Sequence, residues 1–208
     1  MIVGTFNGAN VIQAPTSKFV EMDWTAHDAD SMSQSPWTGQ SQVYQWGAQW
    51  WALTIAFPSM SRADMQPWQA FLLELSGRAN VFLAGMYGES QPLGSYNGTG
   101  LTLANAGASG NSIVVAGFPV STNNCFLPGD CIQIGYRLYK ILEPVDSNST
   151  GQATLSIWPQ LRDSPAQGTA VITTGCQGLF RLAKNDRGWN YNPHAAYTIP
   201  TLHCLEAL

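Results

Sequence analysis

The chain has 208 residues and a formal net charge of -4 at pH 7, and only 11% of its residues are charged. A typical soluble domain has about 25% charged residues. Nine Lys and Arg residues without a basic run exclude an electrostatic nucleic-acid footprint, and a hydrophobic share of 45% excludes wholesale disorder. Because ions are scarce, we expect neighbouring protein subunits to cover part of the surface.

The apolar stretches of the sequence are short. The longest, such as 50–57 and 71–75, fall far below the roughly 20 residues that span a bilayer. Residues 1–8 lack the basic start and the apolar core of a signal peptide. We therefore expect a protein made in a cytoplasm, without a membrane partner, whose cysteines are reduced and buried. These are Cys125, Cys131, Cys176 and Cys204.

The first 45 residues are polar and rich in turn-forming residues. Within them, the alternation of apolar residues over 18–24 predicts an edge strand. The segment 26–42, rich in Ser, Gln, Asp and Gly, predicts a long exposed loop. Since a loop of this length is usually disordered or functional, we expect it to become ordered on a neighbouring subunit.

A strand, a helix and a second strand are predicted next. Residues 46–57 alternate between two faces and end at Pro58, which is typical of a strand. Residues 80–85 form a second apolar run. Together with the helix between them, these strands predict a compact sheet and helix.

The predicted helix spans about 64–76. Apolar residues recur there at the helical period, and Gly77 suits the left-handed position after a helix. Either Ser61 or Asp64 can cap the start, and Pro67 favours the later start, because a proline in the first turn loses no hydrogen bond. The predicted core residues of the strand and the helix are Trp51, Leu53, Ile55, Phe57, Trp68, Phe71, Leu72 and Leu75.

A Gly-, Ser- and Asn-rich stretch precedes a second β-rich block, which suits a small barrel or sandwich. The tail over 197–205 predicts a closing strand that pairs with the N-terminal block. The predicted fold is mainly β (α+β): a first domain of 1–94 with 184–208, and an inserted domain of 95–183. The candidate strands of the second block are 112–117, 131–142, 153–158, 169–174 and 178–183.

Catalytic motifs are missing from the sequence. It contains no phosphate-binding loop, no His-Glu-x-x-His and no Gly-x-Ser-x-Gly. His203 and Cys204 are neighbours in a predicted strand and therefore point to opposite faces. The early acids, among them Asp23, Asp28 and Asp30, lack the spacing of a calcium loop. We predict no catalytic residue and no cofactor.

The cysteines and the tryptophans each allow two interpretations. The four cysteines suit a metal or iron–sulfur site or plain buried thiols, and the spacing lacks the Cys-x-x-Cys pair that favours a metal. Trp37, Trp46 and Trp50 suit either contacts between subunits or a platform that stacks on sugar rings.

Two sets of motifs stand out in the sequence. The first is Trp50-x-Ala-Leu-Thr-Ile-x-Phe-Pro-x-Met, followed by Trp68-x-Ala-Phe-Leu-x-x-Leu-x-Gly77. The second is Leu127-Pro-Gly-Asp130 with Gly151-x-Ala-Thr-Leu-x-Ile-Trp-Pro. The first set resembles tailed-bacteriophage minor tail proteins, and the second is similar to an insertion in the same proteins. The resemblance covers roughly residues 46–208.

The resemblance implies a non-enzymatic structural protein of the virion, located at the tail tip. Distal tail proteins of this kind form a ring between the tail tube and the hub, with a β-rich belt domain that includes a helix and an additional β-domain. The implied partners are further copies of the chain, in a ring of six, three or another number, and the tube, hub and tape-measure proteins.

Two other function classes stay open from the sequence. A carbohydrate-binding module would use the same tryptophans to stack on sugars. A wall-degrading enzyme would need two carboxylates or a Cys/His pair in one cleft, for which Asp23, Asp28 and Cys204 are the residues to test.

Overall fold

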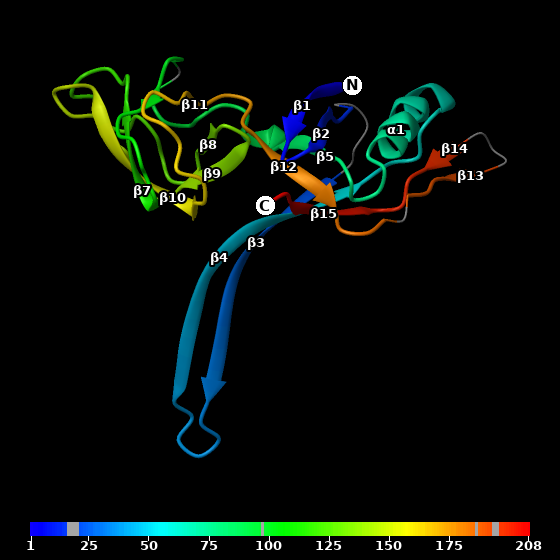
Figure 1. Cartoon of the computed structure of the whole chain (residues 1–208), viewed down its shortest axis with the longest axis horizontal. Helices are drawn as coiled ribbons and strands as arrows, with labels where there is room; N and C mark the ends of the chain where they lie inside the picture. The colour runs from blue at the N-terminus through cyan, green and yellow to red at the C-terminus, as the bar shows by residue number, and fades with distance from the viewer. Residues whose placement is uncertain (16–20, 97, 186, 193–195) are drawn as a thin grey trace. The chain divides into compact units, whose positions relative to one another are not determined.

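The protein is mainly β with a single α-helix among the described residues, as the sequence predicts (Figure 1). The structure is a computed structural model of the chain. No helix in its described part is long and apolar enough to cross a membrane. The described residues are 1–15, 21–96, 98–185, 187–192 and 196–208.

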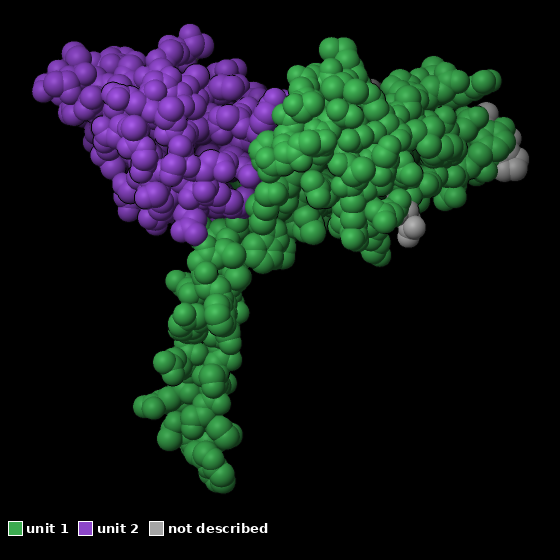
Figure 2. Space-filling view, in the orientation of Figure 1, with its two compact units in different colours: residues 1–82, 180–208 green, residues 83–179 purple. Residues whose placement is uncertain are grey.

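The chain divides into two compact units (Figure 2). Unit 1 comprises residues 1–82 and 180–208, and unit 2 comprises residues 83–179. The predicted domain ends at residues 94 and 183 therefore differ from the unit ends in the structure. The first difference has a clear cause, because the segment after residue 82 is tied to unit 2: Leu93 donates its backbone N–H to the Asp130 carboxylate at 2.7 Å.

The main sheet has seven strands in the order β1-β2-β5-β12-β15-β4-β3. The tail strand β15 pairs antiparallel with β4, with Leu202 opposite Ile55 and Leu205 opposite Ala52. The sequence predicts this pairing of the tail with the N-terminal block. The strands are β1 (Ile2–Phe6), β2 (Ala9–Gln13), β3 (Glu21–Gln34), β4 (Ser41–Ala56), β5 (Val81–Gly85), β12 (Gln177–Leu182) and β15 (Leu202–Glu206).

The hairpin of β1 and β2 was not predicted. Its turn is Asn7-Gly8, and both residues have positive φ, at 48° and 81°. An Asn-Gly pair between two strands is the strongest short-range signal for such a turn. The Asn7-Gly8 turn signal is therefore present in a segment predicted to be polar and rich in turns.

The helix α1 (Arg62–Glu74) begins earlier than predicted. The Ser61 hydroxyl accepts the backbone N–H of Asp64 at 3.3 Å and donates to the Asp64 carboxylate at 2.9 Å. The Ser61 oxygen thus satisfies the Asp64 N–H, one of the free donors of the first turn, so Ser61 is the cap and Pro67 lies inside the helix. The predicted start at residue 64 is wrong, because the cap outweighs the one hydrogen bond that Pro67 removes.

Aromatic rings connect α1 to the sheet. Trp68 packs edge-on against Phe71, and Phe71 against Phe82, with ring centroids 5.6 and 5.5 Å apart. Of the eight predicted core residues, Phe57 is half-buried at the end of β4, and its ring meets Trp68 at 4.7 Å. The other seven are buried: Trp51, Leu53, Ile55, Trp68, Phe71, Leu72 and Leu75.

The predicted loop over 26–42 is wrong. Residues 21–34 and 41–56 form the two long strands β3 and β4, and only the turn 35–40 joins them. The alternation of apolar and polar residues does not reveal these strands. Both faces of the ribbon are exposed, so neither strand needs an apolar face. Of the predicted edge strand over 18–24, residues 18–20 lie outside the described part, and the remainder belongs to β3.

Unit 2 contains a six-stranded sheet in the order β11-β8-β9-β10-β7-β6. Its two edges meet, because Leu103 donates its N–H to Thr169 at 3.0 Å and Val171 donates to Leu101 at 2.9 Å. The sheet thus forms a nearly closed barrel around a buried apolar core. Its strands are β6 (Thr102–Leu103), β7 (Gly110–Ala116), β8 (Cys131–Ile134), β9 (Arg137–Ile141), β10 (Gln152–Leu161) and β11 (Val171–Ile172).

Two predictions for this block need correction. The single strand predicted over 131–142 is a hairpin of β8 and β9, because Gly135 has a φ of 60° and reverses the chain there. The strand predicted over 178–183 is β12, which pairs with β15 in the seven-stranded sheet. The remaining elements are the short helix η1 (Tyr87–Glu89) and the hairpin of β13 (Asn190–Asn192) and β14 (Ala196–Thr198).

Candidate functional site

The most distinctive feature of unit 1 is a two-stranded ribbon that continues beyond the sheet. Among the described residues, β15 pairs with β4 only from Ala52 to Ile55, whereas β3 and β4 stay paired out to Gln34 and Ser41. We call residues 27–50 the arm. In Figure 1 its blue and cyan strands curve away from the rest of unit 1. At a rise of about 3.3 Å per residue, the arm reaches about 25 Å beyond the sheet.

Large apolar side chains are exposed along the arm. Trp37, at the tip, is 93% exposed, and Trp46 is 66% exposed. The rings of Tyr44 and Trp46 meet edge to face at 4.8 Å. On the opposite face, Met32 and Val43 face each other across the two strands, and both are exposed. Both faces of the arm therefore present apolar surface to solvent.

The third candidate tryptophan, Trp50, lies at the base of the arm. It is half-buried and stacks on His27, with ring centroids 5.4 Å apart and planes 13° from parallel. Between the base and the outer part, the register shifts after Asp28, and Gly47 has a φ of 73°. This bulge bends and twists the ribbon at that point.

A two-stranded ribbon by itself is only marginally stable in water. Exposed apolar side chains that gather on one element usually mark a surface that binds another molecule. The arm has both properties, because its outer part gains no third strand among the described residues and keeps Trp37, Tyr44 and Trp46 in solvent. The arm is therefore the best candidate for an association site.

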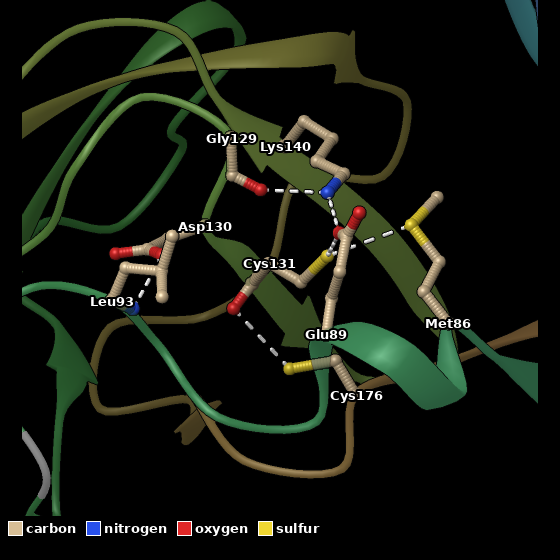
Figure 3. A network of polar contacts seen from close by, with 8 residues as sticks. All are labelled: Met86, Glu89, Leu93, Gly129, Asp130, Cys131, Lys140 and Cys176. Atoms are coloured by element: carbon tan, nitrogen blue, oxygen red, sulfur yellow. Dashed lines mark hydrogen bonds and ion pairs between the residues drawn. The ribbon is translucent and has the colours of Figure 1, made fainter.

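A second cluster of functional groups lies in unit 2, beside a cavity of about 210 Å³ (Figure 3). Glu89, from η1, forms an ion pair with Lys140, from β9. Lys140 also donates to the Gly129 carbonyl at 2.6 Å. The Cys131 thiol donates to the same Glu89 carboxylate at 3.4 Å. The cluster ties η1 to the barrel.

Proton affinities in this cluster disfavour a reactive thiolate. Burial raises the pKa of Cys131 to about 11 and that of Cys176 to about 12. Burial lowers the pKa of Lys140, but its hydrogen bonds and charge interactions with Glu89 and Cys131 together outweigh this and leave the pKa raised. At neutral pH the thiols are therefore protonated and the lysine is charged. This arrangement suits a structural contact better than a nucleophile.

The turn before β8 is anchored by a buried carboxylate. Asp130 is 4% exposed, and its oxygens accept the backbone N–H groups of Leu127 at 2.8 Å, Leu93 at 2.7 Å and Gly94 at 3.2 Å. These three donors occupy most of the roughly four acceptor sites of a carboxylate. It fixes the loop at residues 93–94 against the barrel.

The four cysteines do not form a metal site. Across the described ranges, no group of three or more His, Cys, Asp or Glu side chains is placed to hold a metal ion. Cys125 instead donates to the Thr122 carbonyl at 3.3 Å, and Cys176 to the Cys131 carbonyl at 3.4 Å. Cys204 belongs to unit 1, whereas the other three belong to unit 2.

The remaining candidate residues do not converge either. Along β15, Cys204 is buried and His203 exposed, so the two side chains lie on opposite faces. Asp23 and Asp28 are exposed on β3, and the Asp28 carboxylate accepts the Gln49 side-chain amide at 2.7 Å. His194, a further isolated histidine, lies outside the described residues.

Sequence reasoning missed the pairing of Glu89 with Lys140. The two residues are 51 positions apart, and no sequence spacing connects them. Only the barrel topology brings them together. Comparison with known proteins adds no relative: no protein-family model and no curated protein sequence matches the chain.

Proposed function

We propose that the protein is a structural component of a phage tail tip, and that its copies form a ring between the tail tube and the hub. The resemblance of residues 46–208 to minor tail proteins suggests the class. The observation that carries the proposal is the arm, an exposed ribbon with apolar side chains on both faces.

In an isolated chain the arm would have to stay ordered while both of its faces are in contact with solvent. Each residue ordered in it costs about 1–2 kcal/mol of backbone entropy. In a ring, a neighbouring copy covers the ribbon and offsets that cost, and cyclic symmetry provides every copy with the same neighbour. The low share of charged residues, 11%, supports the same proposal, because the cores of protein interfaces are depleted in charge.

The proposal gives the protein no catalytic role and places it in the virion, after synthesis in the host cytoplasm. Its partners are further copies of the chain, six or three of them, and the tube, hub and tape-measure proteins. The arm, with Trp37 and Trp46, is the part of unit 1 proposed to contact a neighbouring copy.

Analytical ultracentrifugation over a range of concentrations tests the proposal. We expect the full chain to form a discrete closed oligomer, and we expect a variant with residues 27–50 replaced by Asn-Gly to remain monomeric. The replacement joins the strands by a two-residue hairpin turn, so its thermal unfolding is the control for folding. A full chain that stays monomeric up to about 100 µM, above the dissociation constant of most weak complexes, contradicts the proposal.

The carbohydrate-binding alternative makes a different prediction from the same aromatic residues. Tyr44 and Trp46 stand 74° apart, so together they present no single flat platform to a sugar ring. Saturable binding of a monomer to a glycan array, lost in Trp46→Ala, would favour the alternative over the ring.

A further inference from the structure

A pocket lined by basic side chains opens on unit 1. Its volume is about 530 Å³, and Lys184, Arg187 and His203 are among its lining residues, together with apolar Leu182 and Pro200. None of the described lining residues is acidic. Asp186, between Lys184 and Arg187 in the sequence, lies outside the described part of the chain. We call this the basic pocket.

The cations of the basic pocket are held in place by the fold. Arg187 donates to the carbonyls of Leu72 and Leu73, both at 3.2 Å, in the last turn of α1. Helix carbonyls at a C-terminus attract a cation and orient it, so the Arg187 guanidinium is fixed. Lys184 is exposed, and among the described residues no contact ties its ammonium group to an acid. The described lining thus combines a guanidinium held by α1 with an exposed ammonium group.

The arm has the opposite charge. Residues 27–50 include two acids, Asp28 and Asp30, and no Lys or Arg. Both acids are exposed, and they flank the bulge of β3. Asp28 accepts one hydrogen bond from Gln49, which leaves its charge in place.

We propose that the arm of one copy docks at the basic pocket of a second copy, with Asp30 near Lys184. This inference rests on the proposed ring function and names the contact within it. The arm and the pocket are different surfaces of the same chain, so a contact between them is head-to-tail. Such a contact leaves one arm and one pocket free on each pair. Further copies can therefore add until a closed ring uses the last arm and the last pocket.

Charge reversal tests the contact directly. In about 50 mM salt, Asp30→Lys alone and Lys184→Glu alone should each raise the dissociation constant of assembly about fivefold. The two substitutions combined in one chain should restore it to within about twofold, because the opposite charges face each other again. Both side chains are exposed, so neither variant should change the thermal unfolding. The matched control is Glu143→Lys, an exposed acid in unit 2.

A crosslink provides a second, independent measurement. Protein with Asp30→Cys, mixed with protein with Lys184→Cys, should form a disulfide-linked pair when copper phenanthroline oxidises the two thiols. The four native cysteines are buried and do not compete. A mixture of Glu143→Cys with Lys184→Cys should form no such pair.

The outcomes separate this inference from the proposed function. If a ring assembles with unchanged affinity in both single variants, and no crosslink forms, the contact proposed here is wrong while the ring function stands. If the unmodified chain stays monomeric at about 100 µM, both are overturned. Restored affinity in the double variant, together with the crosslink, supports the contact.

Discussion

The side chain of Glu206 continues the hydrogen-bond ladder of β15 to Trp51, one residue beyond the last pair of the two strands. Its Oε2 atom accepts the Trp51 backbone N–H at 3.0 Å, and Glu206 is only 8% exposed. The last residues that pair through the backbone are Leu205 and Ala52. Glu206 therefore marks the point where β4 leaves the sheet and the arm begins.

Removing this carboxylate should destabilise unit 1. We expect Glu206→Ala to lower the free energy of unfolding by about 1–3 kcal/mol, because the Trp51 N–H loses the Glu206 acceptor. Glu206→Gln keeps an acceptor oxygen and should cost less. Urea unfolding measures both, and Glu143→Ala, at an exposed position, should stay within about 0.5 kcal/mol of the parent chain. Equal losses for Glu206→Ala and Glu143→Ala would contradict the role of Glu206.

The Asp130 carboxylate should matter to unit 2 in the same way. It accepts three backbone N–H groups, so Asp130→Ala removes the acceptor of three part-buried donors and should cost about 3 kcal/mol. Asp146 accepts a single backbone N–H, from Asn124 at 2.7 Å, and Asp146→Ala should cost about 1 kcal/mol. Urea unfolding that gives Asp146→Ala the larger loss would show that Asp130 is not the anchor of this loop.

The sequence predicts the parts of the fold that local chemistry determines. The helix follows from a cap and an apolar stripe that lie within one segment, as Ser61 and Trp68 illustrate. The arm was missed because no apolar face is needed where a ribbon has solvent on both sides, and the pairing of β3 with β4 depends on the partner strand.

The candidate site depends on how the chain is folded in three dimensions, whereas the helix and several strands depend mainly on local sequence. The tryptophans of the arm were predicted as contact residues, and the structure places Trp37 and Trp46 in solvent on one ribbon. The basic pocket joins residues from β12, β15 and the chain beyond β12, and its guanidinium is fixed by α1. These segments are far apart in sequence, and no spacing rule connects them.

Alanine substitutions at two tryptophans should distinguish an effect on stability from an effect on association. Trp68 is 2% exposed and packs between Phe57 and Phe71, so Trp68→Ala should lower the free energy of unfolding by about 3–5 kcal/mol. Trp37, at the arm tip, should change stability by less than about 0.5 kcal/mol when replaced by alanine. We expect Trp37→Ala to weaken oligomer formation in analytical ultracentrifugation. An oligomer as stable as that of the parent chain would remove Trp37 from the contact.

The arm should also differ in dynamics between free and assembled protein. In the monomer its ribbon gains no third strand in the described part of the sheet, so backbone amides at 41–46 should exchange with solvent quickly. In a ring, cover by a neighbouring copy should slow that exchange at least about tenfold. Hydrogen exchange read by mass spectrometry measures both states, and the amides of buried β8 are the control. Equal exchange of the arm in both states would show that it does not contact a neighbour.

Stability should fall at alkaline pH because buried thiols resist ionisation. Burial raises the pKa of Cys204 to about 12, against about 8.5 in an unfolded chain. Between these values only the unfolded chain loses this proton, so the contribution of Cys204 is complete below about pH 8.5 and is lost as pH rises toward 12. The expected slope is about 1.4 kcal/mol per pH unit for this thiol. Urea unfolding at pH 8.5 to 10.5 measures it, and Cys204→Ala should show a slope shallower by that amount, whatever its stability at pH 8. Parallel slopes in the two proteins would show that Cys204 ionises as readily in the folded chain as in the unfolded one.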